Sequence, residues 1–177
     1  MTIFSTLNDR GLPLSDADIF KAKIYNKIDE KDKMGFVDKW KNIALRAENV
    51  DESVQELFYY YMFYLRAIDK DKNTTTPGLR KYFAENSFSR LYKDNLMENL
   101  EDILEFWEVV NCREQKDAKW TSDLEILSIL DILSSYPNEF WKYPVIIYYL
   151  ENKDTENFEE IFLSFLNYTH HKLDILL

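Results

Sequence analysis

The sequence predicts an all-α protein, a multi-helix irregular bundle of about eight helices. In most segments the apolar residues recur at the spacing of one helix face. With only 3 Gly and 4 Pro in 177 residues, the chain has few residues for the tight turns of an all-β sandwich or barrel. Hydrophobic residues make up 46% and aromatic residues 16%, which is enough to form a core. We therefore expect a single helical unit.

The first helix is expected to begin at Ser15. Ser15 and Asp18 stand at the spacing of a capping box, in which each side chain accepts a hydrogen bond from a backbone N–H at the helix start. The apolar stripe of this helix consists of Ile19, Phe20, Ile24 and Ile28.

Two further helices are expected before a long loop. The second spans roughly Phe36 to Ala47, and the third begins near Asp51 or Ser53 and keeps an apolar face as far as Leu65. The segment DKDKNTTTPG, residues 69–78, interrupts this periodicity with polar residues, Pro and Gly, so it is predicted to be a loop.

After the loop, Thr76 is expected to cap a short helix that has Pro77 at its first position. The stretch from Asp94 to Asn111 follows with apolar residues at helical spacing, which predicts a long amphipathic helix.

The last three helices are bounded by further local signals. Ser122 and Glu125 form a second capping-box spacing and open a helix that Pro137 closes. Another helix follows, and Pro144 is expected to kink or split it because Pro removes an intrahelical hydrogen bond. The final helix runs from about Thr155 towards the C-terminus.

Charge and composition argue against several classes of protein. The 32 acidic and 22 basic residues give a net charge of −10, whereas a surface that holds DNA or RNA by itself needs a concentrated basic patch. The single cysteine, Cys112, allows no internal disulfide framework; we expect a buried structural thiol and a reducing, cytoplasmic setting. The first residues do not form a signal peptide, and no window approaches the ~18 consecutive apolar residues of a membrane span.

Two groups of titratable residues could carry chemistry, but each has a simpler structural explanation. His170 and His171 point about 100° apart on a helix, so one metal cannot easily bind both and we expect a solvated or partly buried pair. The acidic run from Asp94 to Glu108 could supply paired carboxylates for a metal or for acid–base work, although a solvated outer face explains it without further assumption. The members that share a face are Glu98, Glu101, Asp102 and Glu105. We predict no metal site.

The aromatic cluster FYYYMFY, residues 58–64, could stack nucleic-acid bases or bind a partner. A helix with aromatic residues on all sides is more often buried between its neighbours, and no Lys or Arg interrupts the cluster.

The opening segment is different in kind, because Asn8, Asp9, Arg10 and Gly11 lie between an apolar fragment and a capped helix. Turns and helix starts gather polar groups around anions. Arg10 could bind a phosphate or carboxylate, and Gly11 could adopt a positive φ at the turn. The alternative is an ordinary turn in which Arg10 bonds a neighbouring carbonyl or pairs with Asp9 or Asp16.

Residues 3–25, IFSTLNDRGLPLSDADIFKAKIY, closely resemble the second signature segment of a known domain family. The family is the S-type (ParB-like, DGQQR-containing) domain of GmrSD-type modification-dependent restriction endonucleases, with a pattern of roughly F-x-x-L-N-x-R-G-x-x-L-S-x-x-D followed by a helix. The matching residues are Phe4, Leu7, Asn8, Arg10, Gly11, Leu14, Ser15 and Asp18.

This resemblance implies a role in bacterial defence against modified foreign DNA. It implies a nucleoside triphosphate and a divalent metal as cofactors of the full-length protein, and an HNH-type nuclease domain or subunit as a partner. Contact with DNA would occur only through the full-length assembly. The DGQQR segment and the HNH-type segment do not occur in these 177 residues. We therefore expect the missing nucleotide-binding segment to lie upstream, in a longer protein.

The resulting expectation divides the chain in two. Residues 1–25 would be the remnant of a ParB-like domain and residues 26–177 the helical domain of the C-terminal portion of such a protein. The chain would contribute Asn8, Asp9, Arg10 and Gly11 to a nucleotide- or phosphate-binding site whose catalytic residues are unknown, and it would not be active alone. The alternative function is a non-enzymatic helical module that binds a protein partner.

Overall fold

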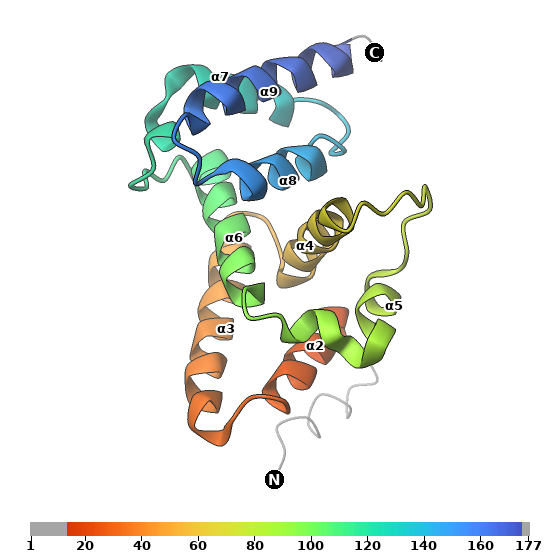
Figure 1. The fold of residues 1–177 in the computed structure, drawn as a ribbon. Helices are drawn as coiled ribbons and strands as arrows, with labels where there is room; N and C mark the ends of the chain where they lie inside the picture. The colour runs from red at the N-terminus through yellow and green to blue at the C-terminus, as the bar shows by residue number, and fades with distance from the viewer. Residues whose placement is uncertain (1–13, 175–177) are drawn as a thin grey trace. The chain divides into compact units, whose positions relative to one another are not determined.

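The computed structural model describes residues 14–174, with Asp174 in its backbone only. All regular structure in that range is helical, which confirms the predicted all-α fold (Figure 1). The α-helices are α2 (Asp16–Tyr25), α3 (Lys33–Asn49), α4 (Val54–Ile68), α5 (Leu79–Ala84), α6 (Leu96–Cys112), α7 (Leu124–Ser134), α8 (Lys142–Asn152) and α9 (Phe158–Asp174). The short 3-10 helices are η1 (Glu30–Asp32), η2 (Glu85–Tyr92) and η3 (Lys119–Ser122).

The described residues form two compact units. The first contains residues 14–59 and Asn73–Met97, and the second contains Tyr60–Lys72 and the described residues from Glu98 onwards. The sequence led us to expect a single helical unit. No break in composition marks this division, because α4 carries apolar residues without interruption across Tyr59 and Tyr60.

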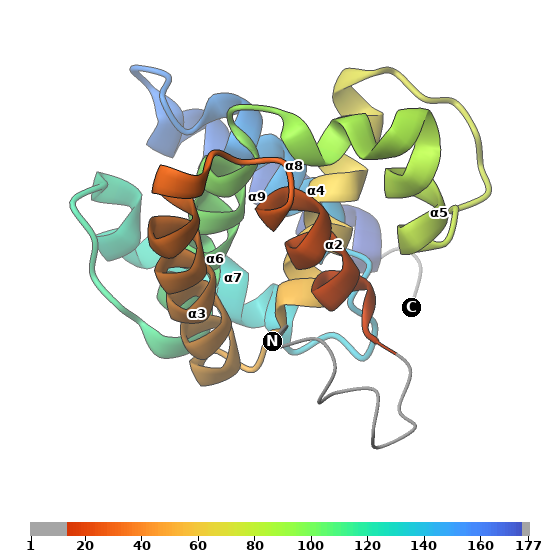
Figure 2. The same ribbon diagram turned by 90° about the horizontal axis from the view of Figure 1, so that it is seen from below.

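The first unit is built around packed phenylalanines from three helices. Phe20 of α2, Phe58 of α4 and Phe83 of α5 are each 0% exposed. Their ring centroids lie 4.9 Å (Phe20–Phe58), 5.0 Å (Phe20–Phe83) and 5.5 Å (Phe58–Phe83) apart. Helix α2 also packs against α3 and η2 (Figure 2). The aromatic residues that the sequence scatters over 60 positions therefore meet in one core.

The second unit has its own aromatic core around Phe106 of α6, which is 0% exposed. Its ring centroid lies 5.2 Å from that of Trp107, 5.5 Å from Trp120, 5.0 Å from Tyr149 and 6.4 Å from Phe162. Helix α7 packs along α9, and α8 also contacts α9 (Figure 1).

The predicted capping box at the start of α2 is confirmed. The Ser15 hydroxyl accepts a hydrogen bond from the Asp18 backbone N–H at 3.1 Å, and the Asp18 carboxylate accepts one from the Ser15 N–H at 3.3 Å. The helix ends at Tyr25, so Ile28 lies beyond the apolar stripe to which the sequence assigned it.

The predicted start of α5 is wrong. The helix begins at Leu79 with Gly78 as its N-cap, two residues after the expected Pro77. Gly78 has no side chain that could cap the helix, and the acceptor comes from another helix: the Asp16 carboxylate of α2 accepts a hydrogen bond from the Arg80 backbone N–H at 3.2 Å. A tertiary contact thus replaces the local cap that Thr76 was expected to provide.

Two other boundary predictions need correction. The N-cap of α7 is Asp123 and not Ser122, since the Asp123 carboxylate accepts hydrogen bonds from the N–H groups of Glu125 and Ile126. Pro144 neither kinks nor splits a helix, because α8 begins at Lys142 and Pro144 falls in its first turn. In the first turn the backbone N–H groups have no intrahelical acceptor, so Pro costs no hydrogen bond there.

Candidate functional site

The predicted site residues Asn8, Asp9, Arg10 and Gly11 lie outside the described residues. The structure does describe the helix that this segment leads into, from Leu14 onwards.

The start of α2 is fixed to α5 by an arginine that is distant in the sequence. Arg80 Nε donates to Asp16 Oδ1 at 2.8 Å, and Arg80 Nη2 donates to the Leu14 carbonyl at 3.1 Å. With the backbone bond to Asp16 Oδ2, both carboxylate oxygens of Asp16 accept a hydrogen bond from Arg80. The sequence left Asp16 open as a partner of Arg10, whereas in the structure Asp16 serves as the anchor of α5.

No sequence signal could have identified Arg80. It lies 64 residues from Asp16, outside any capping or helical spacing, and only the packing of α5 against the start of α2 brings the two together. The Arg80 side chain remains 53% exposed and that of Asp16 is 21% exposed. A cationic guanidinium is therefore held at the point where the segment resembling the restriction family joins the helical body.

The acidic run of α6 is only partly the solvated face that the sequence predicted. Glu98 and Glu105 are exposed, Asp102 is partly buried, and Glu108 is 3% exposed. The run does not converge on a metal site: within residues 14–174 no group of three or more His, Cys, Asp or Glu side chains could hold an ion.

Asp102 is the carboxylate of this run with a perturbed environment. Its carboxylate lies 3.4 Å from Lys153 Nζ. Burial raises the pKa of Asp102 above its usual range; Lys153 opposes this rise, and Glu105 and Glu98 add to it. Burial alone would lower the pKa of Lys153, but Asp102 and Asp154 outweigh it and raise that pKa. We interpret the group as a structural ion pair, because perturbed carboxylates occur in such pairs as well as in active sites.

Tyr149, which is 7% exposed, is expected to make the second unit sensitive to alkaline pH. Burial, with the charges of Asp102 and Glu105, raises the pKa of Tyr149 well above its ordinary value of 10.0. Above pH 10 the unfolded chain therefore loses this proton while the folded chain keeps it, so the free energy of unfolding falls as pH rises.

Tyr149→Phe is expected to flatten this pH dependence. Between about pH 10 and pH 12 the free energy of unfolding of the variant should fall less steeply than that of the parent, by up to about 1.4 kcal/mol per pH unit. Denaturant unfolding at a series of pH values measures the slope. Tyr168→Phe removes a hydroxyl from a side chain that is 61% exposed and serves as the control. Equal slopes for parent and Tyr149→Phe would contradict the prediction.

The histidine pair lies as the sequence predicted, whereas the cysteine does not. Nδ1 of His170 lies 2.9 Å from the hydroxyl oxygen of Tyr136, and His171 is exposed. Cys112, expected to be a buried thiol, is exposed, because it is the last residue of α6 and lies past the buried stripe of that helix.

The aromatic cluster 58–64 contributes to the core as the structural interpretation predicted. Phe58, Tyr60, Tyr61 and Met62 are at most 4% exposed. The ring of Tyr143 lies 5.6 Å from that of Tyr60 and 4.3 Å from that of Phe63, both measured between centroids. The cluster therefore offers no free row of rings for stacking bases.

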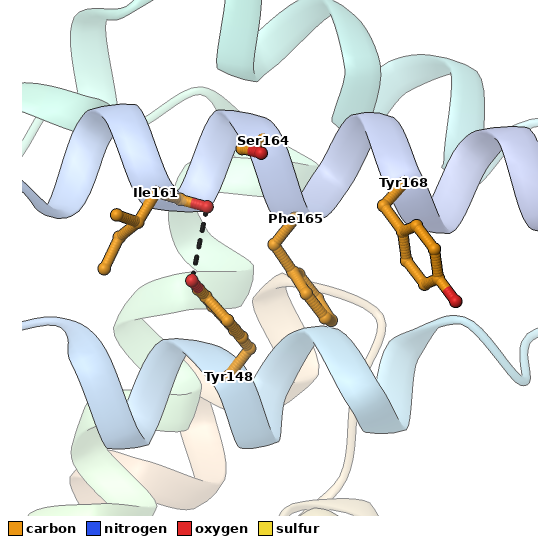
Figure 3. Close-up of a pocket in the computed structure, with 5 residues that line it drawn as sticks. All are labelled: Tyr148, Ile161, Ser164, Phe165 and Tyr168. Atoms are coloured by element: carbon orange, nitrogen blue, oxygen red, sulfur yellow. Dashed lines mark hydrogen bonds between the residues drawn. The ribbon is translucent and has the colours of Figure 1, made fainter.

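A shallow hollow of about 400 Å³ lies between α8 and α9 (Figure 3). Tyr148 and Phe165 stack across it with ring centroids 4.0 Å apart and planes 9° from parallel. The Tyr148 hydroxyl donates to the Ile161 carbonyl at 3.3 Å. The lining is completed by Ser164 and Tyr168, so it contains no charged side chain and has the character of a surface groove.

Comparison of the chain with protein-family models, with curated proteins and with solved structures finds no match. None of the helices within residues 14–174 combines the length and the apolar content that crossing a bilayer requires.

Proposed function

We propose that this chain is the helical portion of a defence protein similar to the S-type component of GmrSD-type restriction endonucleases. In this proposal Asn8, Asp9, Arg10 and Gly11 form one wall of a nucleotide- or phosphate-binding site, and the chain alone is not active. Arg10 neutralises phosphate charge through its guanidinium, and the amide of Asn8 orients the ligand or a metal-bound water.

The anchoring of α2 by Arg80 is the observation that supports this proposal most directly. The segment that resembles the family ends in a capping box, and the same helix start is held to α5 by Asp16 and Arg80. A binding site needs its groups held within a fraction of an ångström, and such supporting contacts provide that precision. The turn before a capped helix is also where backbone N–H groups and the helix dipole favour an anion.

The remaining parts of the site come from other segments in this proposal. A nucleoside triphosphate and a divalent metal are the cofactors, an upstream nucleotide-binding segment completes the site, and an HNH-type nuclease domain or subunit cuts DNA. The assembly acts in the cytoplasm and contacts DNA as a whole, since the net charge of −10 does not favour binding of phosphates by this chain alone.

Arg10→Ala is expected to abolish nucleotide turnover in a protein that joins this chain to the family's upstream segment. The melting temperature should change by no more than about 2 °C, because in this proposal Arg10 binds the ligand and does not support the fold. Arg46→Ala removes another arginine and serves as the control. The chain by itself should show neither nucleotide hydrolysis nor tight DNA binding at physiological salt. Retained turnover with a lowered melting temperature would make Arg10 a structural residue.

A second candidate function is a non-enzymatic module that binds a protein partner. It is favoured by large apolar side chains on the surface of the second unit, where Leu124 is 81% and Phe140 is 75% exposed. In that case Leu124→Ser with Phe140→Ser should abolish association with the protein partner, and Arg10→Ala should leave it intact. Co-precipitation of the partner and nucleotide turnover, measured for both variants, separate the two candidates, because loss of turnover in Arg10→Ala supports the nucleotide-binding proposal.

A further inference from the structure

The first unit contains a pocket of about 490 Å³ that neither the sequence motifs nor the proposed function uses. It is formed by the end of α2, the first turns of α3, the end of η2 and the first residues of α6. A volume of this size lies in the range of small-molecule sites, about 300–1,000 Å³.

The floor of the pocket is apolar and buried. It consists of four residues whose exposed fractions lie between 2% and 9%: Ile24, Phe36, Leu91 and Leu96. Gly35 of α3 also lines the pocket, and a Cβ placed on it meets no atom within 4 Å. The floor can therefore receive an apolar body, and we expect a large side chain at position 35 to compete for the same space.

The rim of the pocket carries more positive than negative charge. Lys27, Lys39 and Lys93 line it together with Asp32 and Asp94. The charged residues of the lining therefore have a net charge of +1, whereas the whole chain has a net charge of −10.

One rim lysine already lies over an aromatic ring of the pocket. Lys27 Nζ is 5.8 Å from the ring centroid of Tyr92, which itself belongs to the lining. An apolar floor below exposed ammonium groups is the pattern of a site for an amphipathic anion, since the charged head and the apolar body of such a ligand are satisfied separately.

We propose that this pocket binds a small amphipathic anion, with a ring system or short aliphatic chain on the floor and a carboxylate or phosphate group at the lysine rim. Lys27 and Lys93 supply the charge, Phe36 and Tyr92 flank the apolar body, and Gly35 provides the room. The residues that carry this proposal do not include Asn8, Asp9, Arg10 or Gly11, so it does not rest on the proposed nucleotide site.

Binding of 1-naphthyl phosphate to the full chain tests this proposal. Isothermal titration calorimetry should give one site with a dissociation constant on the order of 100 μM, the range expected for a ligand of this size. The neutral 1-naphthol should bind at least about five-fold more weakly, because it has no negative charge for Lys27 and Lys93 to attract. Equal affinities for the two compounds would overturn the assignment of an anion site.

Gly35→Trp should abolish binding of 1-naphthyl phosphate by filling the pocket. Gly78→Trp is the matched control, because a Cβ at Gly78 also meets no atom within 4 Å and Gly78 does not line the pocket. The melting temperature of Gly35→Trp should not fall, since Gly is a poor residue inside a helix. Binding by Gly35→Trp with the parent's affinity would overturn the proposal.

Lys27→Ala with Lys93→Ala should weaken 1-naphthyl phosphate at least about five-fold and leave 1-naphthol unchanged. Lys41→Ala, a lysine of α3 that does not line the pocket, is the control. An unchanged affinity in the double variant would remove the lysines from the site and contradict the proposal.

Competition against 1-naphthyl phosphate then identifies the chemical class of the natural ligand. Displacement of 1-naphthyl phosphate by octanoate indicates an aliphatic acid, and displacement by AMP indicates a nucleotide; either supports the pocket as an anion site. Arg10→Ala should leave all of these affinities unchanged. A failure of this proposal is therefore distinguishable from a failure of the proposed function.

Discussion

Phe106→Ala is expected to lower the free energy of unfolding of the second unit by about 3–5 kcal/mol. Phe106 is 0% exposed and is surrounded by the rings of Trp107, Trp120, Tyr149 and Phe162. Removing the ring loses the favourable free energy of transferring it from water into the core. It also leaves a cavity that these large neighbours cannot collapse to fill. Since domains are stable by only about 5–15 kcal/mol, this loss is large.

Urea unfolding followed by tryptophan fluorescence measures this effect. Trp120 stacks on Phe106 with centroids 5.5 Å apart, so the signal reports on the affected core. Phe140→Ala is the matched control, because Phe140 is 75% exposed, and it should change the free energy by less than about 0.5 kcal/mol. Similar losses for the two variants would contradict the packing that places Phe106 at the centre of this unit.

Lys116→Met is expected to lower the free energy of unfolding by about 2–3 kcal/mol. Lys116 Nζ lies 2.7 Å from the carboxylate of Glu108, whose side chain is only 5% exposed. Burial alone would lower the pKa of Lys116, but hydrogen bonds to Glu108 and Glu114 outweigh it and raise that pKa. The variant removes the positive charge that lies 2.7 Å from the buried carboxylate of Glu108. The cost is below that of a fully buried pair because the Lys116 side chain is 28% exposed.

The double variant Glu108→Gln with Lys116→Met distinguishes the charge effect from a loss of packing. It removes both charges, so it should recover most of the stability lost in Lys116→Met. Lys119→Met, which changes an exposed lysine in η3, is the control and should have little effect. If the double variant is no more stable than Lys116→Met, the lysine stabilises the fold through its aliphatic chain and not through its charge.

These two predictions concern residues whose burial the sequence analysis did not predict. Phe106 lies in the helix expected from Asp94 to Asn111, but it was not assigned to the apolar face of that helix, and it is buried. Glu108 belongs to the acidic run that was predicted to be solvated, and it is buried against Lys116. Periodicity predicts on which face of a helix a residue lies. It does not predict which distant segment of the chain packs against that face.

The candidate nucleotide site shows the same division on a smaller scale. The capping box of Ser15 and Asp18 was predictable, because both of its hydrogen bonds join residues three positions apart. The anchor formed by Asp16 and Arg80 was not, because it joins residues 64 positions apart and replaces the cap expected from Thr76. The lysine-rimmed pocket was missed for the same reason, since its lining comes from the five elements α2, η1, α3, η2 and α6 and the residues between them.

The sequence by itself determined the all-α fold, the existence of the helices and the local caps that depend on nearest neighbours along the chain. Tertiary structure decided which charged groups are buried in pairs, where α5 begins and that Cys112 is exposed. The N-cap of α7 at Asp123 and the place of Pro144 in the first turn of α8 are local features that the sequence analysis misjudged. Helix formation depends on propensities and hydrogen bonds over three or four residues, whereas burial and pairing depend on contacts between segments that are far apart in sequence.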